Sequence, residues 1–164
     1  MNAMREQDGA ADLAGIEEGQ VFTSRPKAMT RERMRWYVDA QATAVANDGK
    51  PRFGGPTIHD DDDYALSQGL PGIIADGMVS TNWIMALLIE AFGSAAVRSG
   101  RLRTKYVAPV YEDMMLVCHA IVTGIAEEDG KRVVCLDVWC ATPDDKKVTV
   151  GEALIRFPLD ARGA

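Results

Sequence analysis

The feature that most constrains the fold is one long apolar segment, which predicts a helix from about Gly77 to Val97. Its apolar side chains recur at helical spacing and cover most of the circumference: Met78, Ile84, Met85, Leu87, Leu88, Ala91 and Phe92. At 1.5 Å per residue such a helix is about 30 Å long, roughly the depth of a small domain. Because it is apolar on nearly all sides, it must be enclosed by other structure.

The C-terminal part of the chain can supply this enclosure, because it reads as strands separated by turns. The predicted strands are 103–110, 114–124, 131–141 and 147–157. Acidic, Gly and Pro residues predict hairpin turns at 127–130 and 143–145. In the last strand the apolar alternation changes phase at Gly151, which predicts a β-bulge there.

Four shorter elements are predicted ahead of the long helix: an extended piece at 17–26, a helix at 30–39, a loop at 47–56, and a helix from Asp60 to Ser67 that ends at 69–72. Thr30 and Asp60 are the expected N-caps of the two helices. These elements predict an α+β fold, in which a mostly antiparallel sheet of about five strands curls around the central helix.

Composition indicates one globular domain in 164 residues, 47% of them apolar and 26% charged. The net charge of −6 argues against nucleic acid as a partner, because phosphate binding needs clustered cations. Residues 1–15 lack the apolar run of a secretory signal, and no stretch is long enough to span a membrane, so a cytoplasmic location is expected. The spacing of Cys118, Cys135 and Cys140 fits no metal site, so reduced thiols in the core are expected.

Four short motifs occur in this chain, and in their order and spacing the chain resembles the MaoC-like acyl-CoA dehydratase and hydratase family. They are Glu18-Gly-Gln-Val-Phe22, Pro56-Thr-Ile-His-Asp60, Ala75-Asp-Gly-Met78 and Tyr106-Val-Ala-Pro-Val-Tyr111. The resemblance implies a hot-dog fold, with a curved antiparallel sheet wrapped around a long central helix. It also implies that residues 16–160 form one such domain, preceded by a flexible segment at 1–15.

The chain departs from the family pattern at two positions. The family carries an aspartate five residues before its catalytic histidine; here His59 matches the histidine and Gly54 stands in place of the aspartate. The family often has a histidine before the Gly-Met pair of the central helix, and here that residue is Asp76. One carboxylate is therefore lost and another is gained nearby.

Hydration of a 2-enoyl thioester needs a base for water, an acid for the α-carbon, and donors for the enolate oxygen. His59 is the candidate for proton transfer, since histidine titrates near neutral pH. The backbone N–H groups of Gly77 and Met78, at the positive end of the helix dipole, are the candidate donors. Glycine at position 77 is expected to let the acyl group approach closely.

Asp76 has two readings that the sequence leaves open. Aspartate is a strong N-cap residue, which would occupy the same amides. Alternatively, Asp76 is a relocated catalytic carboxylate that orients His59 or activates water. Asp48 is a weaker replacement for the missing acid, because Asp-Gly is a common turn pair. His119, within an apolar run, is interpreted as structural.

Arg103 and Lys105 are candidate ligands of the phosphates of coenzyme A or of a carrier-protein arm, although a solvated strand edge also explains them. No metal is predicted, because the acidic run at 60–63 has no calcium-loop spacing. No separate cofactor is expected, since the coenzyme A or carrier arm belongs to the substrate.

The resulting prediction is an acyl-thioester hydratase or dehydratase with an atypical catalytic carboxylate. Two alternatives remain: a hot-dog acyl-CoA thioesterase that uses Asp76, or an inactive substrate-binding subunit of a heteromeric dehydratase. The resemblance also implies a dimer that pairs two sheets, either a homodimer or a heterodimer with a related subunit.

Overall fold

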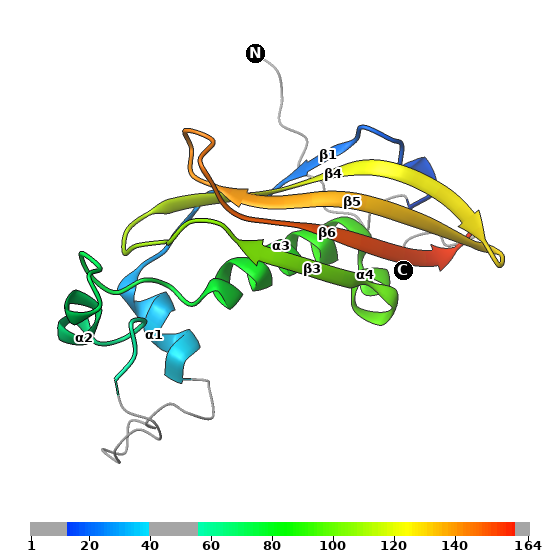
Figure 1. The fold of residues 1–164 in the computed structure, drawn as a ribbon. Coiled ribbons are helices and arrows are strands. Elements are labelled where there is room, and N and C mark those ends of the chain that lie inside the picture. The colour runs from blue at the N-terminus through cyan, green and yellow to red at the C-terminus, as the bar shows by residue number, and fades with distance from the viewer. Residues whose placement is uncertain (1–12, 40–55, 160–164) are drawn as a thin grey trace.

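Six strands curve around one apolar helix, α3, in the computed structural model, which describes residues 13–39 and 56–159 (Figure 1). The strand order is β1-β4-β5-β6-β3, with β2 pairing the start of β4, and all pairs are antiparallel. The strands are β1 (Val21–Thr23), β2 (Lys27–Ala28), β3 (Arg101–Tyr106), β4 (Met115–Glu128), β5 (Lys131–Ala141) and β6 (Lys147–Pro158). The predicted α+β architecture is confirmed.

The central helix α3 is shorter than its apolar pattern predicts. It runs from Gly77 to Phe92, and Gly93 (φ +57°) then turns the chain into a second helix, α4 (Ser94–Ser99). The predicted end at Val97 is wrong because glycine adopts this left-handed conformation at no steric cost. The face of α3 toward the sheet is buried, with Ile84, Leu88 and Phe92 at most 2% exposed.

Two hairpins connect the three longest strands, as the sequence predicts. Asp129 and Gly130 both have positive φ, 49° and 71°, which suits a two-residue turn between β4 and β5. The turn between β5 and β6 includes Asp145, with φ +63°.

The bulge predicted at Gly151 is wrong. Gly151 pairs in regular register with Val138 on one side and Thr104 on the other. A Cβ at Gly151 would lie 2.1 Å from the carbonyl oxygen of Arg103, so glycine serves here to let β3 approach β6 closely. The register shifts in β4 instead, between Val122 and Gly124, and at the end of β5.

Two short helices gather at the end of the molecule where α3 begins (Figure 1). Helix α1 (Arg31–Asp39) is capped by Thr30, whose Oγ1 accepts a hydrogen bond from Arg33 N. Helix α2 spans Asp62–Ser67. Its N-cap is Asp61 and not the predicted Asp60, since Asp61 Oδ1 accepts the bond from Tyr64 N.

Arg31 ties these helices together. Its guanidinium contacts Asp62 and Glu112 at 2.7 Å each, which links α1, α2 and the segment before β4. Residues 40–55 lie outside the described part of the chain, so the predictions for Gly54, Asp48 and most of the 47–56 loop are not addressed by the structure.

The remaining predictions concern the chain ends and the thiols. Residues 1–12 lie outside the described residues, and Leu13–Gly15 form a short 3-10 helix, η1, in which Leu13 is buried. Cys118 and Cys140 are buried, as expected, but Cys135 is exposed, because it faces outward from β5. None of the described helices has both the length and the apolar character needed to cross a membrane.

Candidate functional site

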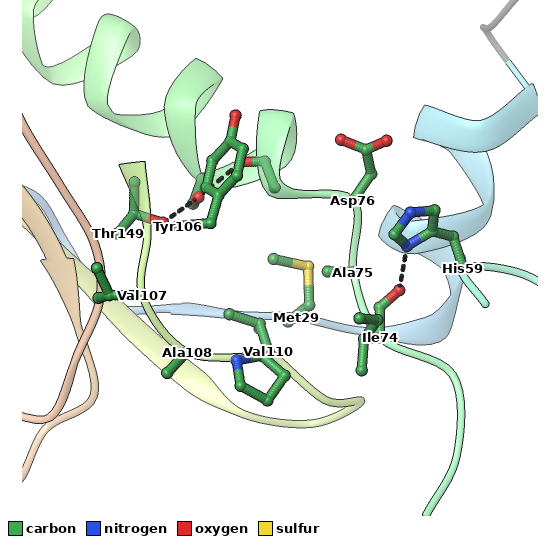
Figure 2. Close-up of a pocket in the computed structure, with 13 residues that line it drawn as sticks. Met29, His59, Ile74, Ala75, Asp76, Tyr106, Val107, Ala108, Val110 and Thr149 are labelled. Carbon is green, nitrogen blue, oxygen red and sulfur yellow. Dashed lines mark hydrogen bonds between the residues drawn. The ribbon is translucent and has the colours of Figure 1, made fainter. Parts of the chain in front are cut away.

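A pocket of about 390 Å³ lies where α3 begins, between the turn bearing His59 and the end of β3. Its walls are largely apolar, with a small number of polar groups: Met29, His59, Ile74, Ala75, Asp76, Gly77, Ser80, Tyr106, Val107, Ala108, Pro109, Val110 and Thr149. Figure 2 shows His59, Ile74 and Asp76 on one side of the pocket and Tyr106 and Thr149 on the other. Such an apolar cavity with convergent polar groups is typical of a small-molecule site.

His59 is held by a network of local hydrogen bonds. Asp60 Oδ1 accepts bonds from the N–H and hydroxyl of Thr57, and His59 N donates to Thr57 Oγ1. The imidazole Nδ1 lies 2.9 Å from the carbonyl oxygen of Ile74 (Figure 2). A carbonyl can only accept, so Nδ1 carries the proton and Nε2 of the neutral ring is the acceptor. This is the tautomer that a general base needs.

Asp76 caps α3. Its Oδ1 accepts a hydrogen bond of 2.8 Å from Met78 N, and its backbone is not helical, with φ −59° and ψ 132°. Among the hydrogen bonds of the described residues, none joins His59 to Asp76, although both line the pocket. The capping role that the sequence left open is therefore present, and the catalytic role stays a prediction.

The two predicted amide donors differ in their availability. Met78 N–H is engaged by Asp76, whereas Gly77 N–H has no hydrogen-bond partner among the described residues. Gly77 lines the pocket at the positive end of α3. The expectation that its missing side chain makes room for an acyl group needs correction, because the ring of Tyr106 occupies that space.

Two buried hydroxyl groups also line the pocket, and sequence reasoning missed both. Ser80 and Thr149 are 3% and 1% exposed, and their hydroxyl oxygens lie 2.7 Å apart. Ser80 donates to Gly77 O at 2.8 Å, so the proton between the two oxygens belongs to Thr149. The sequence did hold a signal for Thr149. Alternate residues of a strand face the same side of the sheet, so Thr149 is expected to face the core together with Ala153 and Ile155.

Arg103 and Lys105 do not reach this pocket. Thr104 and Tyr106 bond to Thr81 of α3, so the alternate residues of β3 face the other side of the sheet. There Arg103 and Lys105 line a separate recess of about 630 Å³ together with Trp139. Their binding of substrate phosphates stays a prediction.

His119 also lies away from the pocket, on the outer side of β4. Its Nδ1 is 3.2 Å from Thr23 Oγ1, and its ring stacks on Trp139 with centroids 5.0 Å apart. Burial lowers the pKa of His119, and Lys147 lowers it further, against an opposing effect of Asp145. These contacts agree with the structural interpretation of His119.

The acidic side chains at the start of α2 make local hydrogen bonds. Asp60 and Asp61 accept backbone hydrogen bonds, and the hydrogen bond from Arg31 lowers the pKa of Asp62. Within the described residues, no three His, Cys, Asp or Glu side chains are grouped so that they could hold a metal ion.

No protein-family model matches the chain, and no curated protein matches it in sequence. Solved structures do resemble it. (R)-hydratase PhaJ1 from Pseudomonas aeruginosa aligns with a TM-score of 0.67 at 20% identity, over 91% of this chain and 86% of its own. The MaoC-like dehydratase from Rhodospirillum rubrum aligns with a TM-score of 0.67 at 15% identity, over 88% and 94%.

A third similar structure is the HadBC (3R-hydroxyacyl-ACP dehydratase) complex from Mycobacterium tuberculosis, with a TM-score of 0.67 at 15% identity, over 88% and 100% of the two chains. At these identities the likeness establishes the fold. The chain has the hot-dog fold seen in MaoC-like dehydratases and (R)-hydratases. The fold class expected from the sequence is thereby confirmed.

Proposed function

We propose that this protein is a MaoC-like hydratase or dehydratase that interconverts 2-enoyl and 3-hydroxyacyl thioesters. The observation that carries the proposal is the hydrogen bond from His59 Nδ1 to Ile74 O, which leaves Nε2 as a base in the pocket. Gly77 N–H, which has no hydrogen-bond partner among the described residues, supplies an oxyanion donor in the same pocket. The similar structures named as hydratases and dehydratases support this reaction class.

In the hydration direction, His59 Nε2 removes a proton from water as the water oxygen bonds to C3 of the enoyl group. The electron pair of the C2–C3 double bond moves toward the thioester, and the enolate oxygen receives the hydrogen bond of Gly77 N–H. The imidazolium of His59 then donates its proton to C2, which completes the addition of water. Dehydration follows the same steps in reverse.

Asp76 serves in this proposal as the second catalytic group. Its negative charge, on the same side of the pocket as His59, stabilises the imidazolium formed during the reaction (Figure 2). It thereby replaces the aspartate of the family pattern, whose position is occupied by Gly54. The acyl group is carried on coenzyme A or a carrier-protein arm, and no further cofactor takes part.

A dimer is part of the proposal. β3 is an edge strand that pairs only with β6 among the described strands, so its other side can accept a strand from a second chain. A homodimer is the first choice. A heterodimer with a related subunit is the second choice, since the similar HadBC structure from Mycobacterium tuberculosis is named as a complex.

One observation also favours a thioesterase. The Asp76 carboxylate lies at the start of the central helix and lines the pocket, where it could activate water against the thioester carbonyl. This reaction releases a free thiol, which hydration does not. An inactive subunit would show neither reaction until its partner is added.

A panel of 2-enoyl-CoA and saturated acyl-CoA esters separates these functions, with enoyl absorbance and free thiol followed independently. Hydratase activity removes the enoyl absorbance without releasing thiol. We expect His59→Gln to lower kcat/KM by about 10²- to 10⁴-fold, the usual contribution of a general acid-base group. His119→Gln is the matched control, because the second histidine lies outside the pocket, and it should keep full activity. Full activity of His59→Gln, or thiol release in place of hydration, would overturn the proposal.

A further inference from the structure

The ring of Tyr106 covers Gly77 at the first turn of α3. A Cβ added to Gly77 would lie 2.6 Å from three ring carbons, Cδ2, Cε1 and Cε2. These carbons lie on both sides of the ring, so a point equally close to all three is above the ring face. Gly77 is therefore packed under the face of the aromatic ring, and any larger residue would displace the ring.

Hydrogen bonds hold the ring in this position. The Tyr106 hydroxyl is 3.0 Å from Thr81 Oγ1 and 3.2 Å from Met78 Sδ, and Thr81 is in turn 2.9 Å from Thr104 Oγ1. Tyr106 also lines the pocket while 46% of its surface remains exposed. The ring thus forms a wall of the pocket that packs against Gly77 and is partly exposed to solvent.

This wall adjoins the position of the reacting thioester. A carbonyl oxygen bound to Gly77 N–H lies about 2.9 Å from the nitrogen, and Gly77 Cα is about 1.5 Å from the same nitrogen. We take the groups attached to the carbonyl carbon to lie on the side of Cα that the ring covers. The space beside the carbonyl is limited by an aromatic face that is anchored at its hydroxyl end.

We propose that Tyr106 is a specificity-determining residue that restricts the site to acyl thioesters without a branch on the carbon next to the thioester carbonyl. This inference rests on the proposed function, because it takes the carbonyl oxygen to bind at Gly77 N–H. A methyl branch on that carbon would have to displace the ring. A difference of one methyl group in an apolar site changes kcat/KM by about 10- to 200-fold.

The test compares crotonyl-CoA with 2-methylcrotonyl-CoA as substrates, and butanoyl-CoA with 2-methylbutanoyl-CoA as saturated ligands measured by calorimetry. The wild-type protein should favour the unbranched ester by at least about tenfold. Tyr106→Ala should narrow this ratio by about tenfold, whereas Tyr106→Phe keeps the ring and loses only its hydroxyl anchor, so its ratio should stay closer to that of the wild type. Tyr64→Ala removes an exposed tyrosine of α2 that does not line the pocket, and should leave the activity and the ratio unchanged.

Melting temperatures test separately whether the Tyr106 ring packs against Gly77. Gly77→Ala should lower the melting temperature, and the decrease should be smaller when Tyr106→Ala has already removed the ring. An unchanged ester ratio in folded Tyr106→Ala overturns the inference. If the esters bind but none is hydrated, the proposed function fails and the ratio of binding constants still tests Tyr106. If no ester binds, both proposals fail.

Discussion

Asp76 Oδ1 accepts a 2.8 Å hydrogen bond from Met78 N, so one carboxylate both caps α3 and lines the pocket. The bond uses one of the two helix amides that the sequence suggested for substrate binding, and Gly77 N–H is left as the donor without a partner among the described residues. An N-cap needs only a side-chain acceptor, whereas stabilising an imidazolium needs the negative charge. The two roles of Asp76 are therefore separable by substitution.

Substitution of Asp76 by Ala and by Asn should have different effects on stability. Asp76→Ala removes the cap, which should cost about 1 kcal/mol of unfolding free energy, whereas Asn is an equally good cap and should cost little. Both variants lose the charge, so both should lose at least about tenfold in kcat/KM. Urea denaturation and the enoyl assay give the two quantities. An Asn variant with full activity would leave Asp76 as a cap only.

The fold was largely predictable because its signals are local and strong. The apolar run of α3, the turn pair Asp129–Gly130 and the cap residue Thr30 each specify their structure within a few positions. The end of α3 was missed because a glycine inside an apolar run is compatible with a continuing helix, and Gly93 ends it by adopting φ +57°.

The site was predictable only in part. The sequence motifs selected His59, Asp76 and Gly77, which line one pocket. Contacts between distant segments supplied the rest: Thr149 reaches Ser80 from β6, and the ring of Tyr106 covers Gly77 from β3. Both contacts depend on how α3 packs against β3 and β6, which local sequence patterns do not specify.

The buried pair of Ser80 and Thr149 should respond asymmetrically to loss of each hydroxyl. Ser80→Ala leaves the Thr149 hydroxyl buried without its acceptor, which should cost about 1–3 kcal/mol of unfolding free energy. Thr149→Val removes a donor while Ser80 keeps its bond to Gly77 O, so the cost should be about 1 kcal/mol. Urea denaturation measures both. If Thr149→Val is less stable than Ser80→Ala, the assignment of Thr149 as the donor and Ser80 as the acceptor is wrong.

The three thiols should react at different rates. Cys118 and Cys140 are 1% and 0% exposed, with their sulfur atoms 3.4 Å apart, whereas Cys135 is exposed. A thiol-specific reagent such as DTNB should therefore modify one thiol per native chain quickly, and the other two only after unfolding in urea. Cys135→Ser should abolish the fast phase. Fast modification of two or three thiols would show that this part of the sheet opens readily.

His119 should make the stability of the protein depend on pH. Burial is the main cause that lowers its pKa below 6.5, so the unfolded chain binds the proton more readily than the folded chain does. The contribution of the neutral ring is therefore fully present above about pH 6.5 and is lost as the pH falls through the folded-state pKa. Urea midpoints of the wild-type protein should decrease from pH 7.5 to pH 5.0 by more than those of His119→Gln. Equal decreases in the wild type and His119→Gln would contradict the prediction.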